Sequence, residues 1–393
     1  MDQNKKTNSM KVIFVSNYFN HHQQPFSDAM YERLGDDYTF LATEAVEEER
    51  IKMGWQATGF PRYVKQTNYK DKQKIEKWSD IIERADVVIG SAYYYKLLLK
   101  RMKSRKLTFL YSERLYKTNS RLLKAPIHAY RAFLLRHSYL LCASAFTAFD
   151  YALTGNFRKK CFKWGYFPIL KEYDNLEELI DGKGESEGLK HQQDVSILWV
   201  ARLIGLKHPE MLVKLALYLK SKGYKFRIRI IGNGPLESKL HRMVESHNLS
   251  ECVELLGPKT PEEVREYMES SNIFLFTSDR NEGWGAVLNE SMNSCCAVIA
   301  NSKIGSVPYL LKNGENGFSY DSEKDFFEKA ETLVKDSALR KKFGANAYRT
   351  MAETWNAQKA CEKFFQLIDT LKGHSELTIS EGPCSNADVI WGF

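Results

Sequence analysis

The stretch Ile273-Phe-Leu-Phe-Thr277, followed by Glu282-Gly-Trp-Gly-Ala-Val-Leu-Asn-Glu290, predicts a strand, a turn and a helix. The apolar run reads as a buried strand, and the two glycines free the backbone to bend sharply. Residues 286–292 then read as a helix whose first amides point back at the turn, where an anion could dock. Two carboxylates, eight residues apart, flank this turn.

The spacing of the two acids carries no information by itself. Five other glutamate pairs have the same separation, at Glu177/Glu185, Glu237/Glu245, Glu254/Glu262, Glu315/Glu323 and Glu323/Glu331. In none of them does a glycine turn enter a helix between the acids. The turn therefore distinguishes Glu282 and Glu290 from the other pairs.

Length and composition favour a two-domain enzyme. The chain has 393 residues and 43% hydrophobic content, which is enough for a large core. No run approaches the roughly 20 apolar residues of a membrane span, and the polar start has no secretory core behind it, so we expect a cytoplasmic protein. Seven cysteines without a CxxC motif argue against a disulfide framework.

Strand and helix patterns alternate in both halves of the chain, which predicts two parallel sheets. We expect strands at 11–16, 38–43, 87–89, 107–111 and 140–144, and again at 195–200, 226–231, 253–256, 273–276, 298–300 and 317–320. The predicted domains are residues 1–170, a polar linker at 171–194, a second domain at 195–355, and a helix and tail at 356–393. The fold class is α/β, with two facing Rossmann-like halves and a last helix that could cross back to the first.

Ligands of open parallel sheets bind beyond the carboxyl ends of the strands. The loop after 195–200 contains Arg202 and Lys207, the loop after 226–231 is Gly232-Asn-Gly-Pro235, and the loop after 273–276 contains Glu282. We expect these three loops to meet.

Positive charge is concentrated in residues 93–163, which hold sixteen Lys and Arg and only two acidic residues, Glu113 and Asp150. Aromatic and aliphatic residues are interleaved with these charges. The mixture suits an anionic membrane surface, where each Lys or Arg contributes about 1 kcal/mol. Nucleic acid is the competing partner, and a merely solvated face of ordinary helices is the third reading.

These motifs, taken in order, resemble the donor-binding domain of family 4 retaining glycosyltransferases of the GT-B fold. The resemblance covers about residues 196–317 and rests on Ala201-Arg-Leu with Lys207, Gly232-Asn-Gly-Pro235, Val253-Glu-Leu-Leu-Gly257, the Glu282–Glu290 segment and Asn313-Gly-Glu-Asn-Gly317. The first half is similar to bacterial capsule and exopolysaccharide glycosyltransferases through Phe14-Val-Ser-Asn-Tyr-Phe-Asn-His-His-Gln-Gln-Pro25 and Cys142-Ala-Ser-Ala-Phe-Thr147.

The resemblance implies a donor site for a nucleotide sugar, UDP- or GDP-linked. Arg202 and Lys207 would hold the diphosphate and stabilise the leaving group, and Glu282 would face the transferred sugar, so these three are the catalytic candidates. Glu290 would accept hydrogen bonds from the ribose. The remaining donor-binding candidates are backbone positions at the helix start and beside the base: Gly285, Ala286, Val287, Pro258 and Lys259.

The acceptor side is less defined. His21 and His22 could approach the donor phosphates or the acceptor, or one of them could cap the following helix. Glu113 could orient an acceptor hydroxyl or pair with Arg114. Tyr309 and Cys295 depart from residues common in the family, which concerns the identity of the donor sugar.

No Asp-x-Asp pair occurs in the chain, so we expect transfer without a bound metal and without a further cofactor. The expected function is transfer to a lipid-linked or glycan acceptor in cell-surface polysaccharide synthesis, by a peripheral protein on the inner face of the membrane. The alternatives are a GT-B transferase or epimerase acting on a soluble small molecule, and a basic nucleic-acid-binding or scaffold protein. We expect no nucleic-acid partner, because the donor motifs are kept together.

Overall fold

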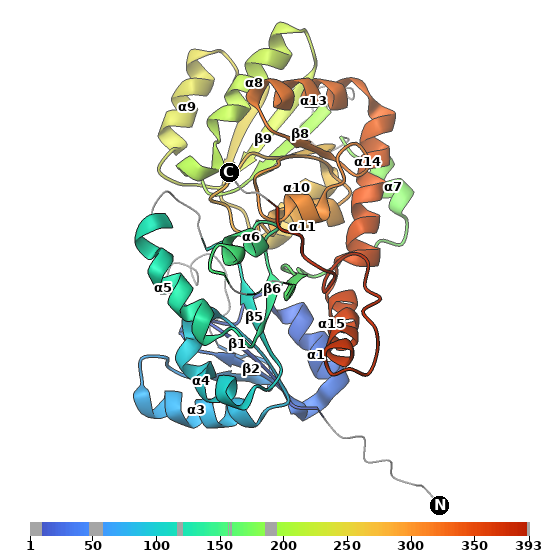
Figure 1. The fold of residues 1–393 in the computed structure, drawn as a ribbon. Coiled ribbons are helices and arrows are strands. Elements are labelled where there is room, and N and C mark those ends of the chain that lie inside the picture. The colour runs from blue at the N-terminus through green and yellow to red at the C-terminus, as the bar shows by residue number, and fades with distance from the viewer. Residues whose placement is uncertain are drawn as a thin grey trace, which may run out of the picture. The chain divides into compact units, whose positions relative to one another are not determined.

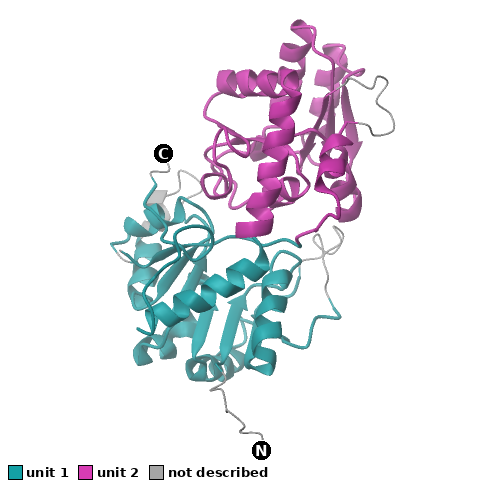
Figure 2. Ribbon diagram, turned by 90° about the vertical axis from the view of Figure 1, so that its right-hand side faces the viewer, with its two compact units in different colours: residues 1–169, 356–393 teal, residues 170–355 magenta. Residues whose placement is uncertain are grey.

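The structure, a computed structural model, describes residues 10–46, 58–115, 121–155, 157, 159–184 and 195–390, with the side chains of residues 121–125 left out. The chain divides into two compact units, which Figure 2 shows in different colours. Unit 1 comprises residues 1–169 and 356–393, and unit 2 comprises residues 170–355. The first residues, up to about Ser9, which we expect from the sequence to be disordered, lie outside the described residues.

Unit 1 is built on a seven-stranded parallel sheet with the order β3-β2-β1-β4-β5-β6-β7. Apolar runs form its central strands, which are buried along most of their length, as expected for strands covered on both faces. The strands are β1 (Val12–Ser16), β2 (Tyr38–Ala42), β3 (Val64–Gln66), β4 (Val87–Gly90), β5 (Thr108–Ser112), β6 (Tyr139–Cys142) and β7 (Cys161–Lys163). The helices are α1 (Gln24–Leu34), α3 (Lys72–Arg84), α4 (Tyr95–Ser104), α5 (Arg121–Leu134) and α6 (Thr147–Ala152), with short 3-10 turns at Gly35–Asp37 and Ala92–Tyr94 (Figure 1).

The end of the chain completes unit 1. Helix α15 (Ala357–Leu371), capped by the Asn356 side chain, packs beside α1 (Figure 1). The tail, in which the sequence shows no periodicity, then runs along the edge of the sheet: Cys384 N donates to Lys163 O at 2.8 Å and Ala387 N to Cys161 O at 2.9 Å. These bonds give the outer side of β7 a partner, so this edge is covered.

Unit 2 repeats the plan with a six-stranded parallel sheet of order β10-β9-β8-β11-β12-β13. Its strands are β8 (Val195–Val200), β9 (Phe226–Ile231), β10 (Val253–Gly257), β11 (Ile273–Phe276), β12 (Ala297–Asn301) and β13 (Phe318–Tyr320). Its helices are α7 (Leu176–Asp181), α8 (Glu210–Ser221), α9 (Glu237–Ser246), α10 (Pro261–Ser270), α11 (Val287–Asn293), α12 (Val307–Leu310), α13 (Glu323–Lys335) and α14 (Ser337–Arg349), with a 3-10 turn at Gly205–Lys207 and a π-helical turn at Thr350–Thr354.

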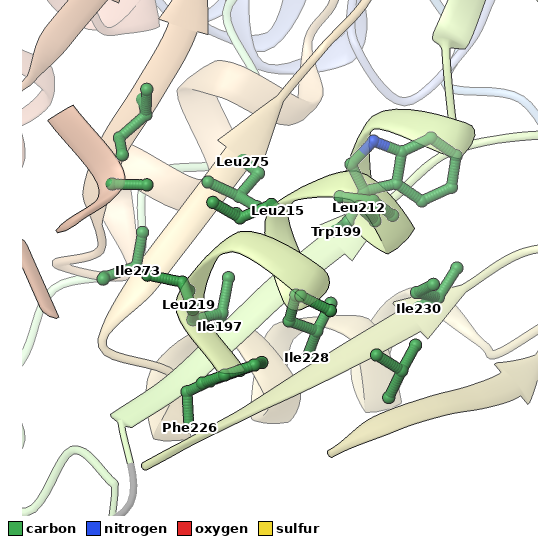
Figure 3. Close-up of a cluster of buried hydrophobic side chains, with 14 of the residues drawn as sticks. Ile197, Trp199, Leu212, Leu215, Leu219, Phe226, Ile228, Ile230, Ile273 and Leu275 are labelled. Atoms are coloured by element: carbon green, nitrogen blue, oxygen red, sulfur yellow. The ribbon is translucent and has the colours of Figure 1, made fainter. Parts of the chain in front are cut away.

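The core of unit 2 lies between this sheet and its helices. Figure 3 shows Leu212, Leu215 and Leu219 of α8 above side chains of β8 and β9, among them Ile197 and Ile228. Each of these five side chains is fully buried, and full burial of a Leu or Ile contributes about 1.5–3 kcal/mol. The i, i+3 and i+4 spacing of apolar residues on α8 explains why this segment is helical.

The predicted fold class is confirmed for the two parallel Rossmann-like sheets and the returning helix. One boundary differs from the prediction, because residues 171–184, assigned to a linker, belong to unit 2. Lys183 is the reason: its buried ammonium group donates to the carbonyls of Met268, Glu269 and Ser271 at 2.9–3.1 Å. The rest of the predicted linker, residues 185–194, lies outside the described residues.

Candidate functional site

In unit 2, strand order reverses between β8 and β11, which are neighbours in the sheet although two strands and the helices α8, α9 and α10 lie between them in the sequence. Ligands of open α/β sheets bind at the carboxyl ends of strands at such a reversal. The loop after β8 carries Arg202 and Lys207, and the loop after β11 carries Glu282. The sheet therefore brings the predicted cations and the first predicted acid to one edge.

Lys207 and Glu282 form an ion pair between Lys207 Nζ and Glu282 Oε2, and each side chain is only 14% exposed. A short, partly buried pair of this kind holds both charges in defined positions. The prediction that the two loops meet is therefore confirmed. Arg202, in the same loop as Lys207, is exposed, and among the described residues no hydrogen bond or ion pair fixes its guanidinium group.

Hydrogen bonds to backbone carbonyls tie the two loops together next to this pair. Thr277 Oγ1, just after β11, donates to Lys207 O at 2.6 Å and accepts from Trp199 Nε1 at 2.9 Å. Asp279 N donates to Leu206 O at 2.9 Å. The carbonyl of Lys207 is thus held by a hydroxyl that is itself oriented by a buried tryptophan.

His208 forms a second connection between the loops. Its Nδ1 lies 3.0 Å from Glu210 Oε1 and its Nε2 lies 3.2 Å from Asp279 Oδ2. Burial alone would lower the pKa of His208, but the hydrogen bonds to Glu210 and Asp279 outweigh it and raise the pKa above its ordinary value.

Two glycines permit the close approach of these loops. Gly285 has φ +79°, and a Cβ there would lie 2.3 Å from Cζ of Phe276. Gly232, with φ +132°, would place a Cβ 2.0 Å from Ala201 O, so the turn after β9 lies directly against the loop after β8. The predicted Gly232–Pro235 turn is therefore part of the scaffold of this edge.

Helix α11 follows the glycine turn, as predicted. It begins at Val287 with Ala286 as its first flanking residue, and Glu290 lies in its first turn, where Glu290 N donates to Ala286 O at 3.2 Å. A hydrogen bond fixes the turn to helix α11, because Trp284 Nε1 donates to Asn289 Oδ1 at 2.8 Å. Trp284 also packs near Trp355 and Tyr309, so the departure from the family at Tyr309 belongs to an aromatic cluster beside this turn.

Pro258 and Lys259 follow β10, two strands away from β8. Gly257 O accepts a hydrogen bond from Gly232 N at 2.9 Å, which joins this loop to the turn after β9. Lys259 Nζ lies 3.3 Å from Glu263 Oε1, and Glu263 closes a capping box with Thr260 at the start of α10. The loop is well anchored, and the ammonium group of Lys259 has a carboxylate partner.

In unit 1, the three predicted acceptor-side residues gather around Tyr166. Tyr166 Oη donates to Glu113 Oε1 at 2.8 Å, and the His22 ring stacks on the Tyr166 ring with centroids 5.9 Å apart. The rings of His21 and His22 are 3.9 Å apart. Burial, and next the charge of Glu113, raise the pKa of Tyr166 well above its ordinary value, so it stays a hydrogen-bond donor at neutral pH.

Local contacts bear on two alternatives from the sequence. The residue before α1 is Gln23, and the Gln23 side chain makes no capping hydrogen bond to that helix. Arg114 forms a buried ion pair with Asp150, at 3.6 Å between Arg114 Nε and Asp150 Oδ2, while Glu113 takes the hydroxyl of Tyr166. That Glu113 orients an acceptor hydroxyl therefore stays a prediction.

The basic segment 93–163 is only partly a surface. Arg101 is fully buried and donates to the carbonyls of Ile82, Ala85, Asp86 and Leu107, and Arg114 is buried as well. The exposed part centres on α5, where Ile127, Tyr130 and Phe133 are 53–60% exposed at helical spacing. Arg131 lies 5.8 Å from the ring of the exposed Tyr93, and Arg136 lies 4.3 Å from the ring of Phe133. We call Tyr93, Ile127, Tyr130, Phe133, Arg131 and Arg136 the α5 surface.

The sequence did not single out His208, Asp279 or Tyr166. His208 stands directly after Lys207, and Asp279 follows β11 by three residues, so position after a strand end was an available signal for both. Tyr166 also follows a strand end by three residues, but that strand, β7, was not predicted from the sequence, so its position gave no signal.

Comparison with known proteins agrees with this geometry. Residues 184–350 match the family model described as Glycosyl transferases group 1. An uncharacterized glycosyltransferase of Methanocaldococcus jannaschii is 33% identical over 127 residues, which are 32% of this chain and 35% of that protein. A putative colanic acid biosynthesis glycosyltransferase of Salmonella typhimurium, WcaL, is 26% identical over 185 residues, 45% of each chain. The alignments thus span less than half the length of these relatives.

The crystal structure of Anabaena HepE in complex with UDP matches 93% of this chain and 100% of its own, with a TM-score of 0.69 and 13% identity. At that identity the similarity concerns the fold alone. The fold is that of the GT-B glycosyltransferases, and the group 1 match falls on unit 2, where Lys207 and Glu282 meet. No helix among the described residues has the length and apolar character needed to cross a membrane.

Proposed function

We propose that this protein is a family 4 retaining glycosyltransferase. It moves a sugar from a UDP- or GDP-linked donor to a lipid-linked or glycan acceptor in cell-surface polysaccharide synthesis. The observation that carries the proposal is the Lys207–Glu282 pair at the strand reversal of a unit that matches the group 1 model. A putative colanic acid glycosyltransferase among the relatives and a UDP complex among the structural neighbours support the substrate classes.

In the proposed reaction, Lys207 and Arg202 bind the diphosphate oxygens and stabilise the charge that develops as the sugar–oxygen bond breaks. Glu282, which is paired with Lys207, contacts the transferred sugar in this proposal. The acceptor oxygen bonds to the anomeric carbon on the face that the diphosphate leaves, and a phosphate oxygen takes the acceptor proton. This route needs no protein nucleophile and gives a product with the anomeric configuration of the donor.

The proposal is tested by incubating the wild-type protein with individual UDP- and GDP-sugars and following release of the nucleoside diphosphate. We expect release with one sugar class, undiminished by EDTA, because the chain has no Asp-x-Asp pair to hold a donor-bound metal. Retention is checked by NMR of the anomeric proton of the product. Loss of activity in EDTA, restored by a divalent cation, would contradict metal independence, and an inverted product would contradict retention.

Replacement of Glu290 by alanine tests the ribose role. We expect nucleotide affinity to fall about tenfold, because the lost hydrogen bonds from the ribose hydroxyls contribute about 0.5–1.5 kcal/mol each. The matched control is Glu262→Ala, which removes an exposed acid from the first turn of α10. Calorimetric titration with UDP and GDP measures both variants. Equal affinities of the two variants would remove Glu290 from the site.

We further propose that the protein works in the cytoplasm, at the inner face of the cell membrane, and that the α5 surface contacts anionic lipid. Exposed aromatic and aliphatic side chains together with arginines suit an interface of acyl chains and acidic headgroups. The same surface lacks the acidic residues that would repel such a membrane, since α5 has none in its sequence.

Vesicle flotation tests this contact. With vesicles of phosphatidylglycerol and phosphatidylethanolamine, we expect the Tyr130→Ser/Phe133→Ser variant to bind about thirtyfold more weakly than the wild type, since partial burial of each ring contributes roughly 1 kcal/mol. The control is Ile81→Ser/Val389→Ser, which removes two exposed apolar residues of unit 1 outside this surface. Binding should fall in high salt. Equal binding of both variants, or binding to RNA in preference to vesicles, would overturn the membrane assignment.

A further inference from the structure

His208 lies next to the Lys207–Glu282 pair and joins the loop after β8 to the loop after β11. Among the described residues, it makes the second charged side-chain contact between these two loops. It directly follows Lys207, has φ +50°, and ends the 3-10 turn Gly205–Lys207. A non-glycine residue in this left-handed region is uncommon and carries a conformational cost. The side chain is 38% exposed, so protons exchange with it freely.

Both ring nitrogens of His208 face carboxylate oxygens, Nδ1 that of Glu210 and Nε2 that of Asp279. Ionised carboxylates only accept hydrogen bonds, and a neutral imidazole has a single N–H to donate. Only the imidazolium can therefore make both bonds. On deprotonation, one of the two nitrogens turns a lone pair toward a carboxylate, and the bond there is lost.

Asp279 in turn organises the segment that carries Glu282. Its carboxylate accepts from Asn281 N at 2.8 Å, and its carbonyl accepts from Glu282 N at 3.0 Å. His208 is bonded to the same carboxylate and is the next residue after Lys207. The spacing between Lys207 and Glu282 is therefore set through the His208–Asp279 bond as well as through their own ion pair.

We propose that His208 is a positioning residue whose protonated ring holds the loops after β8 and β11 at the spacing that binds a nucleoside diphosphate. The inference rests on the proposed function, since it assigns a role within the same donor site. It predicts that affinity for the diphosphate falls as the pH rises through the neutral range, because the neutral ring releases either Glu210 or Asp279.

The charged groups around His208 come from three segments. Glu210 lies in the first turn of α8, Asp279 and Glu282 follow β11, and Lys207 belongs to the same loop as His208; Arg202 and Arg280 are the further cations of these loops. Among these residue types, only histidine ordinarily titrates between pH 5 and 8. The nucleotide's terminal phosphate also titrates near pH 6. The wild type is therefore compared with a variant that binds the same nucleotide, so that titration of the ligand contributes equally to both pH profiles.

The test uses His208→Gly, which accepts φ +50° without strain and removes the ring, and His241→Gln as a control on the exposed face of α9. Calorimetric titrations with UDP and GDP are run from pH 6 to 8.5. We expect the wild type and His241→Gln to lose about fivefold more affinity over this range than His208→Gly, the lower end of typical coupling between sites. Asp279→Asn should flatten the profile in the same way.

A second readout does not depend on the ligand. The Cε1–H signal of His208, identified by its absence in His208→Gly, should titrate above the ordinary range of histidine and shift to lower pH in Asp279→Asn. A raised folded-state pKa stabilises the fold below the ordinary histidine pKa, and this contribution disappears as the pH rises through the raised value. The difference in Tm between the wild type and His208→Gly should therefore shrink with increasing pH.

The outcomes separate the two proposals. If the wild type binds UDP or GDP with the same pH profile as His208→Gly, the positioning role is wrong and the proposed function stands. If no nucleotide or nucleotide sugar binds at any pH while His208 titrates as expected, the donor site is wrong, and the coupling assigned to His208 is wrong with it.

Discussion

Replacement of Lys207 by alanine is expected to lower kcat/KM for sugar transfer by about 10²- to 10³-fold, the range found when one group that stabilises developing negative charge is removed. The structure gives this residue two reasons for a large effect. The Lys207 side chain is only 14% exposed, so its charge is weakly screened, and it is held by Glu282 before any donor arrives. Removal leaves the Glu282 carboxylate without this partner, at the place where a second anion must bind.

A double-mutant comparison separates the two roles of Lys207. In Lys207→Ala, nucleotide affinity should fall further than in Lys207→Ala/Glu282→Gln. The single variant keeps the negative charge of Glu282, which repels the diphosphate, whereas the double variant has lost this charge. The matched control is Lys214→Ala, which removes the ion pair of Lys214 with Glu323 on an exposed part of the same unit. That pair is 47% exposed on each side, so we expect a change in activity below twofold and in stability of about 0–1 kcal/mol.

The activity of these variants is measured as release of the nucleoside diphosphate from the nucleotide sugar, and their nucleotide affinity by calorimetric titration with UDP and GDP. Circular dichroism confirms that each variant is folded. Full activity in folded Lys207→Ala would remove this residue from the donor site. An equal loss of activity in Lys214→Ala would mean that removing any lysine from unit 2 lowers the activity. The positive charge beside Glu282 would then have no specific role.

The strands that flank the site could be predicted from the sequence because they are continuous apolar runs. Val195–Val200 and Ile273–Phe276 were located to the residue, and each predicts the loop that follows it. The edge strand β3 was not predicted, since it has three residues, of which only Val64 is apolar. Strand β7 was also missed. It has three residues, of which only Phe162 is buried, and it acquires its outer partner from residues 384–387, more than 200 positions later.

The candidate site was predictable only where function places residues in fixed order along the chain. Lys207 and Glu282 follow successive motifs, so their meeting could be anticipated. The bond of His208 to Asp279 spans 71 residues, and its partners depend on the left-handed backbone at His208, which no local pattern indicates. The charge count of residues 93–163 overstated the basic surface because composition does not distinguish Arg101, buried among carbonyls, from Arg131 on the surface.

Replacement of Gly285 by alanine is expected to cause a large loss of stability near the site. The left-handed backbone at φ +79° costs an alanine about 1–2 kcal/mol. The added Cβ would also lie 2.3 Å from Cζ and 2.8 Å from Cε1 of Phe276, a buried side chain at the end of β11. Forced displacement of a packed core residue adds typically 1–3 kcal/mol. The sum predicts a fall in Tm of about 5–15 °C for a unit of this size.

Gly223→Ala isolates the backbone part of this effect. Gly223 has φ +77°, nearly the same as Gly285, and a Cβ there meets no atom within 4 Å. Its variant should lose only about 2–5 °C in Tm and keep full affinity for UDP and GDP, since it lies at the far end of α8. In Gly285→Ala the new Cβ would also lie 3.3 Å from Cγ of Glu282, so the displaced turn should weaken nucleotide binding as well. Equal melting temperatures in the two variants would mean that the turn tolerates a side chain, and the close approach of Gly285 to Phe276 would then not be what positions Glu282.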